Sequence, residues 1–426
     1  MTSQRRVTFH LSFPVLALAM LCVLTIIAAQ AAQAQTFNVL HSFTGGGDGA
    51  SPAAGLIMDG GGRLYGTASA GAAGYGTVFR MARSGAGWTF TPLYTFSGGS
   101  DGASPAAALT FGPEGIIYGT TQFGGDLSAC QEPYWTGCGV VFQLTPPSTP
   151  PRSALAPWDE EVIFQFNFWS SGAVPSSEVI FDAAGNMYGT TFGGGSTLDG
   201  HYPGSGEDCG YHCGVAYRLT KTNGEWLQTA VYLFTEDTGS NPFAGLVFDQ
   251  QGNLYGADSY TGPGGYGTIF KLTPSGSSFV ESTLHSFFTG DGGWVYSTLV
   301  MDSAGNLYGG NPGYYNHFDG TVFSINTNGG FSTLYRFGEG AGPYGSLTID
   351  SAGNLYGTTE IGGANNYGTV FKLTHGSWTY TTIHDFASGD GCAPTGKVLL
   401  DANGNLYGTT SGCGSNGHGT VWEITP

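Results

Sequence analysis

A short motif that recurs seven times along the chain constrains its fold more than any other feature. The motif is Gly-Asn-Leu-Tyr-Gly-Thr or a close variant, and each copy is followed by a segment resembling Gly-Thr-Val-Phe. Successive copies lie 48 to 70 residues apart, and their tyrosines are Tyr65, Tyr118, Tyr188, Tyr255, Tyr308, Tyr356 and Tyr407. Repetition at such a period is typical of proteins built from stacked supersecondary units.

A single repeat contains four predicted strands. In residues 346–386 they are 347–350, 354–358, 369–373 and 378–386, and the last strand alternates aromatic and polar residues with a period of two. The turn Asp350-Ser-Ala-Gly-Asn354 joins the first two strands, because Asp can cap its own turn and Gly can adopt positive φ. Four strands per repeat of about 50 residues predict the blade of a β-propeller.

The two ends of the repeat array complement each other. The seventh repeat stops after residues 419–424 and lacks a fourth strand, whereas the segment Phe37 to Phe43 matches the fourth strand of other repeats. Pairing between them would leave no unpaired repeat edge. We therefore predict an all-β, seven-bladed propeller with four strands per blade, whose ring is closed by the N-terminal strand completing the last blade.

The repeat resembles that of the Gloeo/Verruco (GloVer) tandem-repeat family of exported bacterial proteins. The resemblance lies in Asp350-Ser-Ala-Gly-Asn-Leu-Tyr-Gly-Thr-Thr359 and Tyr367-Gly-Thr-Val-Phe-Lys-Leu373, and its seven copies cover residues 37–426. The resemblance implies an exported propeller-like protein and supplies no catalytic residues.

The first 34 residues read as a secretory signal peptide. Arg5 and Arg6 precede an apolar run from Val15 to Ala29 and a small-residue cleavage site at Ala32-Gln-Ala34. Residues 35–426 would then form one propeller domain, with no membrane insertion after cleavage. Without residues 1–34, which hold two arginines and no acid, 10 basic residues face 30 acidic ones. This negative charge opposes binding to nucleic acid. We also expect the protein to be a monomer.

Propeller topology sorts the loops between two faces. With strands A to D counted outward from the channel, the D→A and B→C connections share one face, here called the D→A/B→C face. Two B→C connections carry large insertions, at about 122–137 and 192–212. Variable loops on a rigid scaffold commonly carry binding sites, so we predict that the ligand binds at this face.

Six cysteines of the exported region form three predicted disulfides. The pairs are Cys130–Cys138 and Cys209–Cys213 within the insertions, and Cys392–Cys413 between two loops of the D→A/B→C face. Metal ligation is the alternative interpretation.

Acidic residues recur in the D→A loops, namely Asp48, Asp101, Asp237, Asp291, Glu339 and Asp390. A ring of such acids could bind Ca²⁺, which prefers several oxygen ligands. The alternative is that they cap their own turns. Apart from this possible Ca²⁺, we expect no cofactor.

Residues that break the repeat symmetry are the other binding candidates. They are Trp135, Trp169, Trp294, Tyr314 and Tyr315, in loops of the same face, and the B→C-loop histidines His317 and His418 are added as possible ligands or proton carriers. Exposed aromatic rings suit stacking on sugars, although they could instead pack the loops onto the rim. By contrast, His41, His285 and His384 replace a tyrosine of the fourth strand, which predicts aromatic packing.

These observations favour an exported, non-catalytic binding module that engages a glycan or an extracellular protein through the D→A/B→C face. One alternative is a propeller enzyme, a lyase or glycoside-active, with its site at the channel mouth. The other is a structural protein of the cell envelope. Fold alone does not choose among them.

Overall fold

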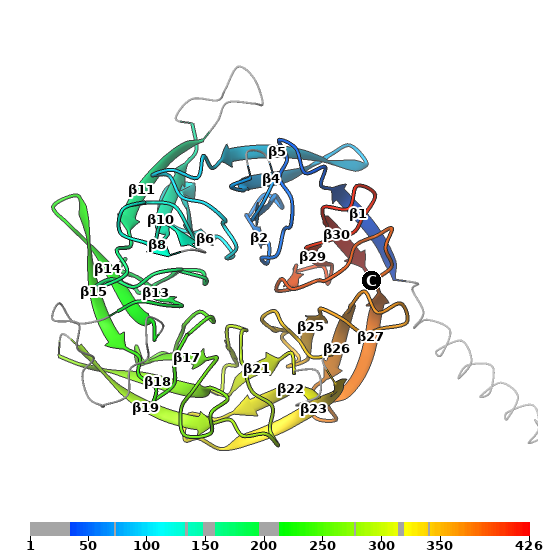
Figure 1. Cartoon of the computed structure of the whole chain (residues 1–426). Coiled ribbons are helices and arrows are strands. Elements are labelled where there is room, and N and C mark those ends of the chain that lie inside the picture. The colour runs from blue at the N-terminus through cyan, green and yellow to red at the C-terminus, as the bar shows by residue number, and fades with distance from the viewer. Residues whose placement is uncertain are drawn as a thin grey trace, which may run out of the picture.

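Seven four-stranded antiparallel sheets surround a central axis in the computed structural model (Figure 1). The structure describes residues 35–71, 74–132, 135–147, 158–195, 213–276, 278–313, 319–339 and 341–426. The predicted seven-bladed β-propeller is confirmed.

Each blade runs from a two-residue inner strand to a long outer strand. Blade 1 comprises β2 (Ile57–Met58), β3 (Leu64–Ala68), β4 (Thr77–Ser84) and β5 (Gly87–Thr95); blade 2 comprises β6 (Thr110–Phe111), β7 (Ile117–Thr121), β10 (Val140–Thr145) and β11 (Asp159–Gln165); blade 3 comprises β12 (Ile180–Phe181), β13 (Met187–Thr191), β14 (Val215–Thr222) and β15 (Glu225–Leu233). Blade 4 comprises β16 (Val247–Phe248), β17 (Leu254–Asp258), β18 (Thr268–Ser275) and β19 (Ser278–Ser286); blade 5 comprises β20 (Val300–Met301), β21 (Leu307–Asn311), β22 (Asp319–Ile325) and β23 (Phe331–Glu339). Blade 6 comprises β24 (Thr348–Ile349), β25 (Leu355–Thr359), β26 (Thr369–Thr374) and β27 (Thr379–Asp385), and blade 7 comprises β28 (Leu399–Leu400), β29 (Leu406–Thr410), β30 (Thr420–Thr425) and β1 (Thr36–Ser42).

The N-terminal strand closes the ring, as predicted. β1 pairs antiparallel with β30, with Phe37 opposite Ile424 and Val39 opposite Trp422. Blade 7 is thus built from both ends of the described chain, and backbone hydrogen bonds replace what would be two open edges. Phe43, which follows β1, is fully buried.

Every residue of the Leu-Tyr-Gly-Thr motif has a structural task, shown here for blade 6. Leu355 is buried, and the hydroxyl of Tyr356 donates to Oδ2 of Asp350 in the preceding turn, at 3.2 Å. Gly357 leaves room for the ring of Phe371 on the next strand, since an added Cβ would lie 2.7 Å from that ring. Thr358 donates from Oγ1 to a backbone carbonyl of blade 7, at 3.2 Å. The motif therefore holds the blade together and joins it to its neighbour.

An aspartate caps the turn between the first two strands in six blades. In blade 6, Oδ1 of Asp350 accepts the backbone N–H groups of Ala352 and Asn354, each at 2.9 Å. The equivalents are Asp59, Asp182, Asp249, Asp302 and Asp401. Blade 2 differs, because a short 3₁₀ helix, η1 (Pro113–Gly115), forms the turn.

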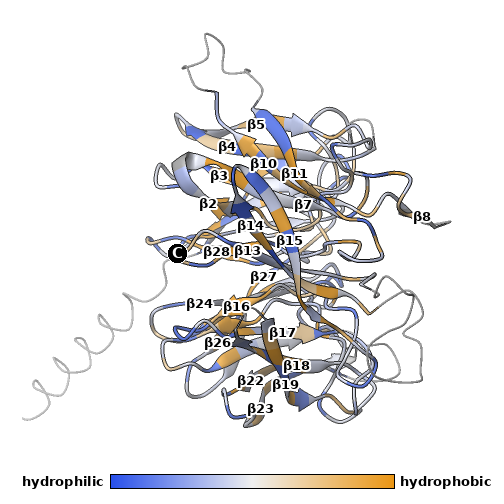
Figure 2. Ribbon diagram, turned by 90° about the vertical axis from the view of Figure 1, so that its left-hand side faces the viewer, coloured by the Kyte–Doolittle hydropathy of each residue, from blue (hydrophilic) through white to orange (hydrophobic). Residues whose placement is uncertain are grey.

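The hydrophobic core lies between the blades rather than at the axis. Each of the seven buried clusters among the described residues joins two adjacent blades. One of them packs Tyr308 and Val322 of blade 5 against Leu347 and Leu355 of blade 6. Each blade packs between two neighbours and so buries both faces of its inner strands, as in β3, where all five residues are buried. Hydrophobic residues therefore follow the strands (Figure 2).

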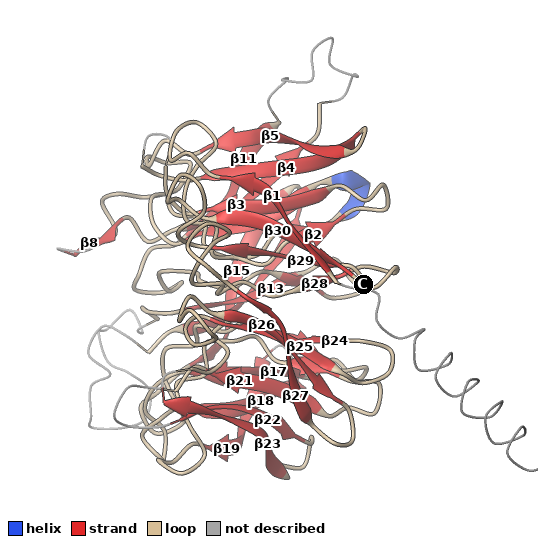
Figure 3. Cartoon of the chain, turned by 90° about the vertical axis from the view of Figure 1, so that its right-hand side faces the viewer, coloured by secondary structure: helices blue, strands red, loops and turns tan. Residues whose placement is uncertain are grey.

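The long loops gather on one face. The two-stranded hairpin β8 (Gln131–Glu132) and β9 (Trp135–Thr136) protrudes there, on the side opposite η1 (Figure 3). It belongs to the first predicted insertion, and residues 196–212 of the second lie outside the described residues. Among the helices of the described part, none is long and apolar enough to cross a membrane.

Candidate functional site

Four of the six recurring acids form hydrogen bonds within their own loops or with the strand before them. Oδ2 of Asp48 lies 3.0 Å from Nε2 of His41 and accepts the backbone N–H of Thr44 at 2.9 Å. Asp101 likewise accepts the hydroxyl of Tyr94 at 3.1 Å and the N–H of Ser97 at 2.7 Å. These hydrogen bonds match the turn-capping interpretation.

The other acids follow this pattern in part. Asp291 lies 2.8 Å from His285 and Asp390 lies 3.1 Å from His384. In the loop after β15 the hydroxyl of Tyr232 donates to Thr238 at 3.1 Å, so Thr238 takes the corresponding place beside Asp237.

Two further observations bear on the predicted acidic ring. Glu339 is the last residue of β23, where its backbone pairs with that of Asp319. The structure describes only the backbone of Glu339. Within the described ranges no three His, Cys, Asp or Glu side chains converge as a metal-binding group.

The three fourth-strand histidines pack against rings of the following blade, as predicted. The ring of His41 stacks on Phe90 at 4.1 Å, that of His285 on Phe331 at 3.9 Å, and that of His384 on Phe37 at 3.8 Å between centroids. Burial lowers the pKa of His41 and of His285 despite the opposing effect of the neighbouring aspartates. These histidines therefore tie the outer strands of adjacent blades together.

The predicted symmetry-breaking residues are scattered. Trp169 is 51% exposed in the loop after β11, with its ring edge-on to that of Phe168. Trp294 lies 6.1 Å from Tyr260 between ring centroids, and His418 is exposed. For Trp135 only the backbone is described, and Tyr314, Tyr315 and His317 lie outside the described residues.

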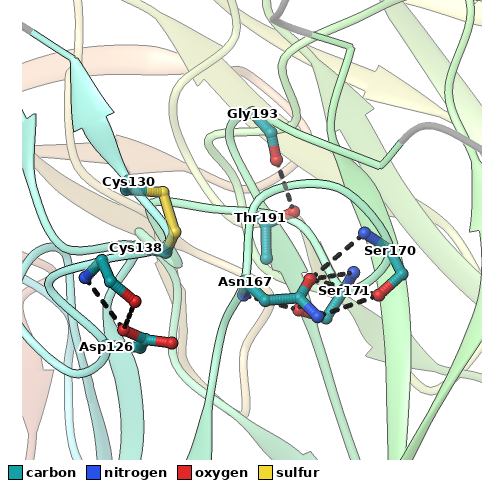
Figure 4. The surroundings of a disulfide bond; sticks show 9 residues. Asp126, Cys130, Cys138, Asn167, Ser170, Ser171, Thr191 and Gly193 are labelled. Carbon is teal, nitrogen blue, oxygen red and sulfur yellow. Dashed lines mark hydrogen bonds between the residues drawn. A yellow bond between two sulfur atoms is a disulfide. The ribbon is translucent and has the colours of Figure 1, made fainter. Parts of the chain in front are cut away.

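Two of the three predicted disulfides are present. Cys130–Cys138 closes the first insertion, beside the loop of Asp126 (Figure 4). Cys392–Cys413 joins two loops of the D→A/B→C face, with the Cα atoms 5.2 Å apart. Cys213 is disulfide-bonded, and its predicted partner Cys209 lies outside the described residues.

A pocket at the channel mouth brings together residues that the sequence analysis did not select. It has a volume of about 490 Å³, and all seven blades contribute to its wall. Blades 1 and 2 contribute only small residues, such as Ala53 and Ala106, whereas Phe243, Tyr296 and Tyr344 line it on the other side. Such a volume is within the range of small-molecule sites, about 300–1,000 Å³.

The aromatic wall is ordered by ring contacts. The rings of Tyr296 and Tyr344 stack at 5.0 Å with an interplanar angle of 19°, and Phe243 meets Tyr296 edge-on at 5.5 Å. The hydroxyls of Tyr260 and Tyr296 are 3.1 Å apart. Phe243, Tyr296 and Tyr344 are each only partly buried, so the wall offers ring surface to a ligand.

Charged and hydroxyl groups complete the pocket. Thr298 donates from Oγ1 to Glu178 at 3.5 Å, and its backbone N–H donates to Oγ of Ser346 at 2.9 Å. Burial raises the pKa of Glu360. Burial, together with the negative charge of Glu360, raises the pKa of Tyr344 to about 12. Lys397 is exposed on the pocket wall.

The sequence does carry a signal for this pocket. In six repeats the D→A loop contains a proline, and the next residue lines the channel. That residue is Ala53, Ala106, Ser176, Phe243, Tyr344 or Thr395, and the repeat without the proline has Tyr296. Aligning the repeats at this position would have shown three large aromatic residues among small ones in consecutive blades.

A second cavity, of about 580 Å³, lies between blades 1 and 2 on the opposite face, beside Arg63, Arg80 and Trp158. Residues 148–157, which join Pro147 to Trp158 at its wall, are outside the described residues.

Comparisons with known proteins bear on family and fold. A family model described as the Gloeobacter/Verrucomicrobia repeat matches residues 25–203, 135–339 and 199–422. No curated protein matches the sequence. The extracellular domain of a candidate one component system from B. thetaiotaomicron is similar in structure, with a TM-score of 0.52 and 10% identity; the match covers 90% of this chain and 39% of that one. The chain therefore spans well under half of that structure, and at this identity the likeness concerns the fold.

Two lactonase structures are also similar. A candidate 6-phosphogluconolactonase from Bacteroides uniformis has a TM-score of 0.47 and 15% identity, covering 77% of this chain and 83% of that one. A gluconolactonase from Xanthomonas campestris has a TM-score of 0.39 and 14% identity, covering 77% and 88%. The three family-model matches, by contrast, span nearly the whole sequence: the chain belongs to the Gloeobacter/Verrucomicrobia repeat family.

Proposed function

We propose that this protein is an exported, non-catalytic binding protein that takes a glycan in the pocket at the channel mouth. The observation that carries the proposal is the wall of Phe243, Tyr296 and Tyr344, which faces small residues across a cavity of about 490 Å³. Aromatic rings present flat apolar surface that stacks on the C–H face of a sugar. Glu178, Glu360 and Thr298 add oxygen atoms that can accept or donate hydrogen bonds to sugar hydroxyls.

The disulfides support export. Cys130–Cys138 and Cys392–Cys413 fit a protein that folds outside the reducing cytoplasm. Both also hold loops of the D→A/B→C face, on which the pocket opens. A preformed loop surface reduces the entropy lost when a ligand binds.

A glycan array screened with and without Ca²⁺ tests the proposal, followed by titration calorimetry on the glycans that bind. We expect Tyr344→Ala to lower the affinity at least tenfold, because it removes one of the two stacked rings. Trp169→Ala is the matched control, since this ring lies in an exposed loop and does not line the pocket. Equal loss in both variants, or loss only with Trp169→Ala, would move the site from the pocket to the outer loops.

The same titrations separate binding from catalysis. Mass spectrometry of the glycan after prolonged incubation is expected to show an unchanged mass. A cleaved product would instead support the enzyme alternative, with Glu178 and Glu360 as the first acids to replace. If no glycan binds at all, the proposed function is wrong.

A further inference from the structure

The pocket has two layers along the channel axis. In each D→A loop the residue after the proline position lines the mouth, and the residue two further along lies nearer the inner strand. Tyr296 and Thr298 form such a pair ahead of β20, and Tyr344 and Ser346 form another ahead of β24. Two extended residues span roughly 6–7 Å, so the second layer lies deeper in the channel.

The two layers differ in chemistry. The upper layer contains the aromatic wall, whereas the deeper layer contains Glu178, Thr298, Ser346 and Lys397. Glu178 comes from blade 3 and Lys397 from blade 7, nearly opposite each other in a ring of seven. The upper layer is therefore suited to the face of a ring. The deeper layer, here called the floor, is suited to hydroxyl or other polar groups.

The perimeter is closed. All seven blades line the pocket, so its wall follows the whole circumference of the channel instead of forming the two sides of a groove across the face. The interior of a polysaccharide chain needs a groove open at both ends. A cavity of about 490 Å³ encircled in this way accommodates only a short segment, of the size of a small drug molecule.

We propose that the pocket recognises the end of a glycan chain and not its interior. The terminal sugar enters along the channel axis, its ring stacks against Tyr296 and Tyr344, and its hydroxyls reach Glu178, Thr298 and Lys397 below. This inference rests on the proposed function and adds to it the mode of binding and the residues of the floor that read the terminal unit.

Chain length provides the first test. Malto-, cello-, xylo- and chito-oligosaccharides of one to six units are titrated against the intact protein by calorimetry. For each series that binds, we expect the affinity to reach its plateau by two or three units and one protein to bind per chain. An affinity that keeps rising to six units, or several proteins bound along one longer chain, would overturn end recognition while leaving glycan binding intact. If no series binds and the array also shows no glycan bound, the proposed function fails and this inference fails with it.

α-Cyclodextrin and maltohexaose provide a sharper comparison if the malto series binds, because both contain six glucose units and only one has ends. We expect α-cyclodextrin to bind at least tenfold more weakly. Equal affinity for the two would overturn the proposal.

Two variants test the floor. Glu178→Gln and Lys397→Met are expected to lower the affinity for the disaccharide and for the hexasaccharide by the same factor, at least fivefold, because both ligands place the same terminal unit there. Lys372→Met is the control, since its ammonium lies over the ring of Tyr356 in blade 6 and outside the pocket. A loss confined to the hexasaccharide would place these residues beside inner units and overturn end recognition.

Discussion

At the scale of single residues, two aspartates of blade 4, Asp258 and Asp249, have pKa values shifted in opposite directions. Asp258 ends β17, is fully buried, and has Oδ1 without a hydrogen-bond partner among the described residues, while Oδ2 accepts the hydroxyl of Thr268 at 2.9 Å. Burial raises its pKa well above the usual value. In blade 5 the same place holds Asn311, which bonds Thr321 through both its amide nitrogen and its oxygen.

We therefore predict that Asp258→Asn stabilises the protein. A buried polar atom without a partner costs about 1–3 kcal/mol, so the melting temperature should rise by a few degrees. A carboxyl whose pKa is raised on folding contributes stability below its unfolded pKa, and that contribution is lost as pH rises through the folded pKa. The gain should therefore grow from about pH 4 towards neutral pH in thermal unfolding scans. A variant no more stable than the parent at pH 7 would contradict this account.

Asp249 of the same blade provides the control with the opposite sign. Burial would raise its pKa, but hydrogen bonds from Asn253, Tyr255 and the turn outweigh that effect and lower it. Such a group contributes stability above its unfolded pKa, and the contribution is lost as pH falls through the folded pKa. Asp249→Asn should thus lower the melting temperature at pH 7, with the loss shrinking below about pH 4.

At the scale of elements, the central strand pair of each blade depends on a glycine that faces a large ring. Gly357 on β25 lies opposite Phe371 on β26, and an added Cβ would also lie 2.9 Å from Leu347 on the inner side. The aromatic ring occupies the space that a side chain would need. This contact explains why the motif contains Tyr-Gly-Thr in a strand, where glycine is otherwise unfavourable.

We predict that Gly357→Ala destabilises the protein by about 1–3 kcal/mol, the usual cost of overpacking. Gly87→Ala is the control, because an added Cβ there meets nothing within 4 Å and no unusual backbone angle is involved. Chemical denaturation of both variants measures the difference. Similar free energies of unfolding for the two variants would show that the blade can open around the extra methyl group.

At the scale of the whole molecule, stability depends on closing the ring. β1 supplies the outer strand of blade 7, and Phe37 packs against His384 of blade 6. A chain that begins at residue 44 should unfold at a temperature at least 10 °C lower than one that begins at residue 35, because an interface and a strand pairing are both lost. A synthetic peptide of residues 36–43 should restore much of the difference in thermal scans. Equal melting temperatures without the peptide would mean that closure contributes little.

The arrangement of the seven blades around one axis explains which parts of the site the sequence could predict. The D→A/B→C face follows from strand order, and the roles of His41, His285 and His384 follow from their exchange with tyrosine. Which side chains share the channel depends on the radial position of each residue, and blades that are far apart in sequence meet only there. Phe243, Tyr296 and Tyr344 are spaced by about one repeat, so only an alignment of the repeats at the proline position, and no pattern within one repeat, brings them together.

The sequence by itself determined the number of blades, the strands within each blade, the closure of the ring and the two disulfides Cys130–Cys138 and Cys392–Cys413. These properties depend on local periodicity, turn chemistry and repetition, which are written along the chain. Only the tertiary structure decided that four of the recurring acids, Asp48, Asp101, Asp291 and Asp390, bond within their own loops. It also decided that a wall of three aromatic residues faces small residues across the channel. The reason is geometric: a carboxylate in a turn can point along its loop or towards the axis with the same sequence around it, and the contents of a central pocket are set by seven separate loops at once.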